Sequence, residues 1–412
     1  MNNSEELKEN VIKCCVEGKM TIKQGAKRLG LSERHVKKLK ARYKEFGASS
    51  MLHGNCGKQP KHTLDTTLRQ RILDIRSLPE YDTVNVSHFK DLLEELHNIK
   101  ISYSAIYRLL QKHNIKSPRK HRKPKQHRRR VRRPQKGELL QADATPHFFF
   151  GNDKEAATLH GFIDDATSNI TGLYMCKNEC MHGYFEITRQ TFRNFGVPES
   201  IYADGSSIFF STSKDKLTIE EELSGMEEPN TQYGKIMDMV GCTLIKAGSS
   251  QAKGRVERLW NTLHDRLITE FKIHNITTIE EANKFLVGYV KKYNKRFAVK
   301  PKDKKSSFIP LLKSVNLDTL LAVKYERQVD NTACFSYRSI TFQIQNIQIS
   351  PKTYVELLIS KRIGMKARYK DNLYSIIPIL DKNNIAIDNT DSINNIVNEF
   401  IYFNCLKDER IA

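Results

Sequence analysis

The sequence predicts a multidomain protein with N-terminal all-α helix-turn-helix units, a central α/β domain and a small C-terminal β-barrel. Three observations lead to this fold class. Helical periodicity with capping signals fills the first 115 residues, strands and helices alternate from 137 to 300, and short strands of alternating apolar residues run from 322 to 380. A chain of 412 residues is long enough for several such domains.

The charge of the chain points to a polyanionic partner. It holds 68 Lys and Arg against 47 Asp and Glu, a net charge of +21, which favours nucleic acid first and an anionic membrane a distant second. No apolar run is long enough for a transmembrane helix, and we expect no secretory signal at the N-terminus. The eight cysteines lack C-x-x-C spacing, which favours reduced thiols in a cytoplasmic protein.

Residues 1–58 predict a first helix-turn-helix domain. A helical stripe begins over Leu7–Ile12, a capping box of Thr21 and Gln24 opens a second helix, and Ser32 caps a third after a turn at Gly30. A basic outer face on the third helix is what a reader of the DNA major groove requires, although an ordinary basic hairpin is the alternative. The third helix has Val36, Leu39 and Tyr43 inward, and Arg34, Lys37, Lys38 and Arg42 outward.

Residues 59–115 predict a second, winged-helix-like unit. Amphipathic helices are expected over 68–78 and 86–96, and a third begins after a cap at Ser102. Two such units in series suggest a bipartite reader of a long DNA site, while a module that only packs against other helices is nearly as plausible. The expected inward residues of these last two helices are Phe89, Leu92, Leu93, Leu96, Ile106, Leu109 and Leu110, with Tyr103, Arg108 and Lys112 available to DNA.

A basic linker follows at 116–136. It contains twelve Lys and Arg and no acid, and three prolines argue against a continuous helix. We expect an extended segment that contacts DNA phosphates without reading bases, with a solvated spacer or a localisation signal as the alternative. Its most concentrated run is Arg128, Arg129 and Arg130.

The α/β domain at 137–300 places three acids at the ends of expected elements. Asp143 lies on the first strand, Asp204 ends a later strand, and Glu257 lies in the first turn of a helix. Phosphoryl transfer on DNA uses two divalent metals, and hard Mg²⁺ or Mn²⁺ prefers carboxylate oxygens. Asp164 and Asp165 are competing acids that we expect to cap a turn between strands, and His147 and His160 are expected to be structural rather than ligands.

Four segments around these acids resemble the DDE superfamily of bacterial insertion-sequence transposases, which have a retroviral-integrase-type (rve), ribonuclease-H-like catalytic core. The resemblance is nearest to the ISNCY-like type and extends to about residue 345. The loop-to-helix pattern that ends in Glu257 is the most specific of the four. The segments are Gln141-Ala-Asp143-Ala, Ile163-Asp-Asp-Ala-Thr167, Tyr202-Ala-Asp204-Gly and Ala252-Lys-Gly-Arg-Val-Glu257.

The resemblance implies that Asp143, Asp204 and Glu257 hold two Mg²⁺ or Mn²⁺ ions for DNA strand cleavage and strand transfer. It also implies that Lys253, Arg255 and Arg258 contact DNA phosphates. The partners would be double-stranded DNA, as terminal inverted repeats and as target, and further copies of the chain on that DNA, with no membrane. Such a bacterial protein would be cytoplasmic and associated with the nucleoid.

One departure from the family is the distance of 53 positions between Asp204 and Glu257. We expect the excess to be a surface insertion over 211–230, which could alternatively supply the third carboxylate.

Helix is expected over 278–321, the barrel over 322–380 with a role in DNA or subunit contact, and a tail over 381–412 that includes a terminal helix. The competing functions are a catalytically inactive sequence-specific DNA-binding protein and a ribonuclease-H-like nuclease without strand transfer.

Overall fold

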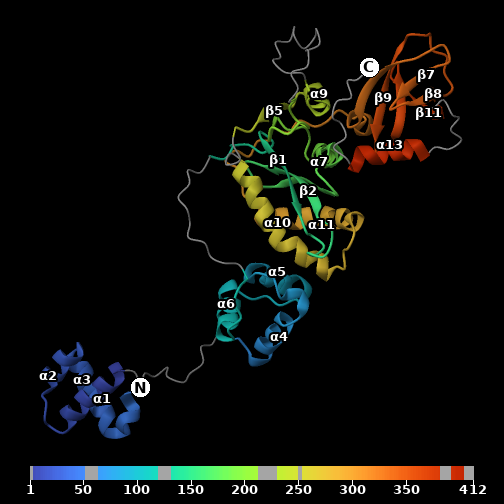
Figure 1. Cartoon of the computed structure of the whole chain (residues 1–412). Helices are drawn as coiled ribbons and strands as arrows, with labels where there is room; N and C mark the ends of the chain where they lie inside the picture. Colours follow the sequence, from blue (N-terminus) through green and yellow to red (C-terminus); the bar gives the residue numbers. More distant parts are fainter. Residues whose placement is uncertain are drawn as a thin grey trace. The chain divides into compact units, whose positions relative to one another are not determined.

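The computed structural model describes residues 3–51, 64–118, 131–211, 230–248, 253–380 and 391–402. The chain divides into two compact units, Met1–Asp74 and Ile75–Ala412 (Figure 1). Several predicted features lie outside the described residues, namely Arg128, Arg129 and Arg130 of the linker, residues 212–229 of the insertion, and most of the tail.

The N-terminal unit has the predicted three-helix arrangement. The Thr21–Gln24 capping box and the Ser32 cap are both confirmed, and Gly30 ends the second helix in a left-handed conformation with φ of 65°. Leu7 was expected inward, but its side chain is 46% exposed, because the buried stripe begins only with Val11 and Ile12. The elements are α1 (Asn3–Val16), α2 (Ile22–Leu29), α3 (Glu33–Phe46) and the 3₁₀ helix η1 (Gly47–Met51).

The second helical segment runs from α4 (Thr66–Arg76) through the 3₁₀ helix η2 (Pro79–Tyr81) to α5 (Val86–Leu96) and α6 (Tyr103–Lys112). The Ser102 cap is confirmed, since its hydroxyl accepts a hydrogen bond from the Ala105 amide. The expected inward residues are buried except Leu96, which is 44% exposed. Helix α5 therefore buries most of the predicted apolar stripe and, in addition, the polar side chains of His88 and Asp91.

A five-stranded mixed sheet forms the centre of the second unit. The first three strands make an antiparallel meander, and the first strand, at the centre of the sheet, also pairs in parallel with the fourth, so the two strands beside it run in opposite directions. The strand order is β3-β2-β1-β4-β5, with β1 (Leu140–His147), β2 (Ala157–Asp164), β3 (Ile170–Cys176), β4 (Ser200–Ala203) and β5 (Thr243–Lys246).

Helices cover both faces of this sheet (Figure 1). Strand residues alternate between the faces, so Leu140 and Ala142 pack in the cluster with α7, while Leu159 and Leu173 pack in the cluster with α10 and α11. The predicted α/β core is therefore confirmed as three layers. These helices are α7 (Met181–Asn194), α9 (Gln232–Met239), α10 (Gly254–Ile273) and α11 (Ile279–Phe297).

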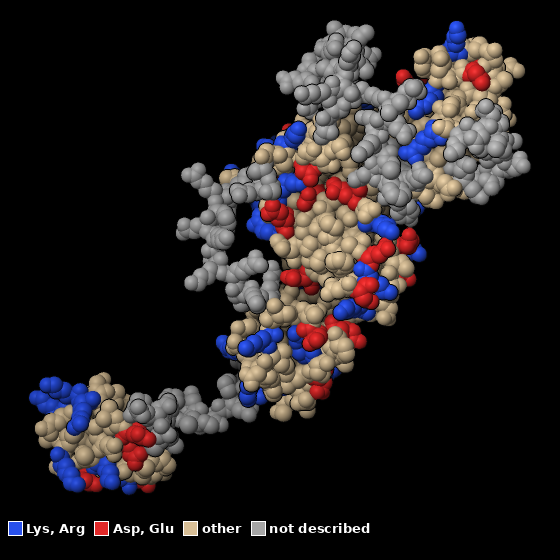
Figure 2. Space-filling model, viewed as in Figure 1, with Lys and Arg blue, Asp and Glu red and all other residues tan. Residues whose placement is uncertain are grey.

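Helix α5 lies against α10 and α11 through buried charged side chains. Asp91 pairs with Arg266 at 2.8 Å and with Arg296 at 2.6 Å, and His88 contacts Glu270 at 3.2 Å. Lys292 also pairs with Glu270, at 2.9 Å. On the surface around α5, α10 and α11, acidic and basic side chains also lie side by side (Figure 2). Helices α5 and α6 are thus part of the same compact unit as the sheet, whereas most of α4 belongs to the N-terminal unit.

We predict that Glu270 makes the stability of this unit depend on acid pH. Burial alone would raise the pKa of Glu270, but hydrogen bonds from His88 and Lys292 outweigh it and lower the pKa to about 2. The stabilisation by this carboxylate is therefore fully present above about pH 4.5, which is its pKa in the unfolded chain. It is lost as the pH falls toward the folded-state pKa of about 2. The contribution at neutral pH is on the order of 3 kcal/mol.

The measurement is urea unfolding between pH 7 and pH 3, followed by the fluorescence of Trp260, the single tryptophan of the chain. Glu270→Gln should be less stable at pH 7 and should lose less stability below pH 4.5 than the wild type. A matched substitution is Glu280→Gln on the exposed side of α11. Equal pH dependence in wild type and Glu270→Gln would contradict the assignment.

The prediction of helix as far as Leu321 is wrong beyond Phe297, where α11 ends. Residues 298–316 leave helical conformation, since Pro301 and Pro310 cannot donate the backbone hydrogen bonds of a helix interior. Only the short α12 (Leu317–Leu320) follows before the barrel. Within the described residues, no helix is long and apolar enough to cross a membrane.

The C-terminal strands form the predicted barrel, which is nearly closed. All its pairs are antiparallel, and α13 (Asp391–Tyr402) packs on β9, β10 and α7 (Figure 1). Arg362 of the barrel donates two hydrogen bonds to Glu186 on α7, at 2.9 and 2.7 Å. The strand order is β6-β9-β10-β11-β8-β7, with β6 (Val323–Gln328), β7 (Cys334–Tyr337), β8 (Ile340–Ile344), β9 (Tyr354–Ser360), β10 (Gly364–Tyr369) and β11 (Asn372–Leu380).

Candidate active site

The pairing of β1 with β4 places two of the predicted acids beside each other. The strands are parallel, with Leu140 opposite Ile201 and Gln141 opposite Tyr202. The same register carried two residues further sets Asp143 level with Asp204, directly after the last residue of β4. Asp143 and Asp204, which are 61 positions apart in sequence, are thus neighbours in the sheet.

Lys253 joins these two carboxylates. Its ammonium nitrogen lies 2.7 Å from Asp143 Oδ1 and 3.5 Å from Asp204 Oδ2, and its side chain is only 8% exposed. Asp204 Oδ1 also accepts a hydrogen bond from the Ser206 amide, which fixes the turn after β4. Two acids therefore converge on one cation at the N-terminus of α10. This cation, Lys253, precedes the third predicted acid, Glu257, by four positions.

A side-chain ladder aligns α10 with β1. The ladder consists of three side chains on one face of β1 that each contact α10. Gln141 Oε1 accepts a hydrogen bond from the Val256 amide, and Asp143 Oδ2 accepts one from Trp260 Nε1. Thr145 Oγ1 contacts His264 Nε2. The contacts advance by two residues on the strand and by four on the helix. These steps are about 6.6 and 6 Å, so strand and helix stay in register.

Glu257 lies within this ladder, between Val256 and Trp260. Residues three apart on a helix are neighbours, so its side chain is one turn from the indole that contacts Asp143. The Glu257 side chain is exposed, whereas Trp260 is buried beneath Gly161, where a Cβ atom would lie 2.6 Å from the indole ring. Asn261, one turn further, donates to the Glu257 carbonyl at 3.0 Å.

Asp165 is a buried anchor behind the predicted triad. Its Oδ1 accepts from Gln141 Nε2 at 2.9 Å and from Arg255 Nε at 2.7 Å, and its Oδ2 accepts from the Arg133 amide at 2.8 Å. This one carboxylate therefore connects the end of the basic linker, strand β1 and helix α10. Asp164 caps the same turn, accepting from the Thr167 amide and hydroxyl and from the Gly137 amide.

Glu179 is a carboxylate near the triad that the sequence reasoning missed. It precedes α7 and accepts a hydrogen bond from the Tyr184 hydroxyl at 2.7 Å. Burial raises the pKa of Glu179, and the negative charges of Asp204 and Asp143 raise it further, against the opposing effect of the Tyr184 hydrogen bond. The local sequence gives no metal-site signal there, because the residue is brought close only by the packing of α7.

The residues predicted to contact DNA fall into two groups. Arg255 is buried against Asp165 and Lys253 against Asp143, so neither charged group faces solvent in this structure. Arg258 is exposed, and its Nε donates to the Gly254 carbonyl at 2.8 Å. The basic residues of α3, namely Arg34, Lys37, Lys38 and Arg42, are all exposed. Lys and Arg side chains cover part of the surface of the N-terminal unit (Figure 2).

The two histidines near the acids lie in structural surroundings. His160 is fully buried and accepts from the Cys180 amide at 3.2 Å, and burial lowers its pKa to about 3. His147 stacks on His264 with ring centroids 4.2 Å apart. The six described cysteines are free thiols.

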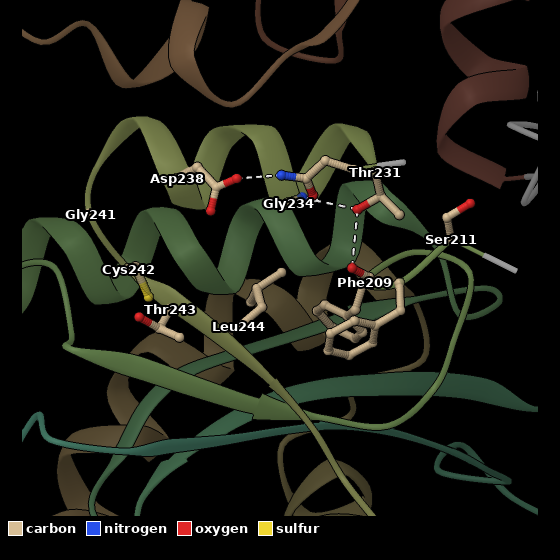
Figure 3. A pocket seen from close by; sticks show the side chains of 11 residues that line it. Phe209, Ser211, Thr231, Gly234, Asp238, Gly241, Cys242, Thr243 and Leu244 are labelled. Atoms are coloured by element: carbon tan, nitrogen blue, oxygen red, sulfur yellow. Dashed lines mark hydrogen bonds between the residues drawn. The ribbon is translucent and has the colours of Figure 1, made fainter. Parts of the chain in front are cut away.

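A cavity of about 440 Å³ lies between residues 209–211, helix α9 and the start of β5 (Figure 3). Thr231 closes one side, since its hydroxyl donates to the Phe209 carbonyl and accepts from the Gly234 amide. Asn230 donates to Asp238 on another side. None of the three predicted carboxylates lines this cavity, so it is separate from the candidate site.

The site fits a divalent cation by its chemistry. Asp143 and Asp204 already share a positive charge, and their oxygens are the hard ligands that Mg²⁺ and Mn²⁺ prefer. Among the described residues, no group of three potential ligands is gathered as a finished metal site. A metal held by these two acids would compete with Lys253 for the same oxygens.

The chain is similar to known proteins both at its N-terminus and over most of its length. A family model described as a helix-turn-helix domain matches residues 7–60. The chain is 34% identical over 362 residues to a transposase for insertion sequence IS1202 from Streptococcus pneumoniae, covering 80% of this chain and 75% of that protein. It is 29% identical over 341 residues to the putative transposase y4bF of Sinorhizobium fredii, covering 82% and 72%.

Two solved structures are similar at lower levels. The HTLV-2 integrase catalytic core domain in complex with magnesium is 15% identical, with 37% of this chain and 83% of that chain covered and a TM-score of 0.27. A simian T-cell lymphotropic virus intasome in complex with a PP2A regulatory subunit is 14% identical, with 74% and 96% covered and a TM-score of 0.31.

Proposed function

The chain belongs to the family of insertion-sequence transposases, and from that premise we propose that it cleaves and joins DNA with a two-metal site formed by Asp143, Asp204 and Glu257. The observation that carries this proposal is the convergence of Asp143 and Asp204 on the ammonium of Lys253. The β1–α10 ladder supports it, because it sets Glu257 one helical turn from the indole that contacts Asp143.

The residues of the chain have distinct tasks in this proposal. Asp143, Asp204 and Glu257 would hold two Mg²⁺ or Mn²⁺ ions, whose chemistry in such a site is activation of the attacking oxygen and stabilisation of the leaving oxygen. Trp260 fixes the orientation of Asp143 through its hydrogen bond at 2.8 Å. Lys253 neutralises the paired acids in the free protein and can turn to a DNA phosphate when a metal takes its place.

DNA recognition is assigned to the helical segments. The exposed basic face of α3 supports major-groove reading of a terminal inverted repeat by the N-terminal unit. Tyr103, Arg108 and Lys112 are exposed on α6, and they offer a second contact from a segment that belongs to the same compact unit as the catalytic residues. Arg258 is an exposed cation beside Glu257, in position for a phosphate near the cleaved bond.

The test is a cleavage assay with the full chain and a labelled duplex that carries the inverted repeat flanking its gene. We expect strand cleavage at the repeat end with Mg²⁺ or Mn²⁺, none with EDTA, and none on a duplex of scrambled sequence. Binding without cleavage under every metal condition would favour the inactive DNA-binding protein. Equal cleavage of the scrambled duplex would favour a nuclease without site recognition.

A further inference from the structure

We infer that the end of the basic linker and the lysine-rich loop 300–305 form one surface that binds the phosphate backbone of duplex DNA beside the catalytic sheet. The surface consists of the exposed lysines Lys136, Lys300, Lys302, Lys304 and Lys305. The inference rests on the proposed function in that DNA is the substrate, and it adds a binding site outside both helix-turn-helix segments.

Backbone hydrogen bonds join the two segments, which are about 170 positions apart in sequence. The Asp303 amide donates to the Pro134 carbonyl at 3.0 Å, and the Ser307 amide donates to the Lys136 carbonyl at 2.9 Å. Lys136 and Ser306 form a parallel β-bridge. The linker, predicted to follow phosphates, therefore continues directly into a second basic segment.

Side chains make the junction rigid. Gln135 donates to Asp303 Oδ2 at 2.7 Å and accepts from the Ser307 hydroxyl at 3.0 Å. Gly137, with φ of 83°, brings the backbone so close to Phe308 that a Cβ atom would lie 2.6 Å from its ring. The lysines thus extend from a fixed backbone, so that a phosphate contact there orders only side chains and no loop.

The nearby acids leave most of the positive charge uncompensated. Asp303 is turned toward Gln135 and the backbone amide of Lys305, and Glu138 pairs with Arg133 at 3.4 Å. Lys300, Lys302, Lys304 and Lys305 are exposed, and none forms an ion pair within the described part of the chain. The five lysines outnumber the nearby carboxylates, Glu199 beside Gly137 included, which gives a surface suited to a polyanion.

The surface lies next to the framework of the candidate site. The Val299 amide donates to the Thr167 carbonyl, and Arg132 donates to the carbonyls of Asp165 and Ala166. Both anchors belong to the β2–β3 turn whose Asp165 holds Gln141 and Arg255. The five cations that form the surface are lysine ammonium groups, which favour phosphate contact over sequence reading. DNA bound there would be guided to the catalytic end of the sheet whatever its sequence.

The experiment measures how the affinity of the full chain for a 30-bp duplex lacking the terminal repeat depends on salt, with EDTA present. Each lost phosphate contact lowers the slope of log affinity against log salt by about 0.9. The triple variant Lys302→Gln, Lys304→Gln, Lys305→Gln should therefore lower the slope by about 2 to 3 and the affinity at 0.1 M salt at least about tenfold.

The matched control removes three exposed lysines at the other end of the sheet, as Lys154→Gln, Lys272→Gln, Lys284→Gln. It should keep a slope close to that of the wild type. An unchanged slope in the first variant, or an equal fall in both variants, would overturn the inference. Because EDTA prevents metal-dependent cleavage, this result is independent of whether the proposed catalytic function holds. Trp260 fluorescence during unfolding verifies that both variants fold.

Discussion

Replacing Glu257 by glutamine should lower metal-dependent cleavage of the terminal repeat at least about a thousandfold, with little change in DNA affinity or stability. The substitution keeps the shape of the side chain and removes the charged oxygen that a divalent metal requires. A metal contributes several kcal/mol to the stabilisation of the transition state, and each 1.36 kcal/mol is a factor of ten in rate. Glu257 is suited to this test because its exposed carboxylate forms no hydrogen bond or ion pair within the described part of the chain.

The measurement is the initial rate of strand cleavage at saturating protein, with Mg²⁺ and with Mn²⁺. Glu280→Gln is a matched control, since Glu280 is also exposed and also in the first turn of a core helix. It should cleave at the wild-type rate. Undiminished cleavage by Glu257→Gln would remove this residue from the site and turn attention to Glu179, another carboxylate near Asp143 and Asp204 in the described part of the chain.

Sequence reasoning was most successful where the structural signal is local. The Thr21–Gln24 capping box, the Ser102 cap and the alternation of strands in the core depend on residues a few positions apart, and all were confirmed. Of the two acids expected at strand ends, Asp204 directly follows β4, whereas Asp143 is the fourth of the eight residues of β1. The β1–β4 register brings the two together.

The missed features depend on contacts between distant residues. Lys253 was expected on DNA, yet it pairs with Asp143, 110 positions away. The buried face of α5 was also missed, since Asp91 and His88 are polar and are buried only because α10 and α11 provide partners about 180 positions later. A buried charge is stable only when it is paired, and the pairing is a property of the fold rather than of the local sequence.

Replacing Asp165 by asparagine should destabilise the catalytic unit by about 3 to 5 kcal/mol, because it leaves the buried guanidinium of Arg255 facing a neutral amide. The side chain of Asp165 is fully buried and accepts hydrogen bonds from Gln141, Arg255 and the Arg133 amide. An amide has one oxygen acceptor, so at least one of these donors loses its partner.

Loss of this anchor should also impair catalysis in the fraction that stays folded. Gln141 holds both Asp165 and the Val256 amide, so Asp165 helps to fix the first of the side-chain contacts that align α10 with β1. A misplacement of about 1 Å in such a site can cost about a hundredfold in rate. Asp165→Asn should therefore lower the cleavage rate at a temperature where it is fully folded, while the affinity for terminal-repeat DNA changes little.

The double variant Asp165→Asn, Arg255→Gln separates the charge from the geometry. Removing both charges should recover much of the lost stability, since the main penalty of the single variant is an uncompensated buried cation. It should recover little of the cleavage rate, because the connection from β1 to α10 stays broken.

Urea unfolding followed by Trp260 fluorescence reports on this unit alone, as the single tryptophan of the chain lies on α10. Asp153→Asn, at an exposed position, should change the stability by no more than about 0.5 kcal/mol. If Asp165→Asn is as stable as that control, or if the double variant is no more stable than the single one, Asp165 is not the anchor of this site.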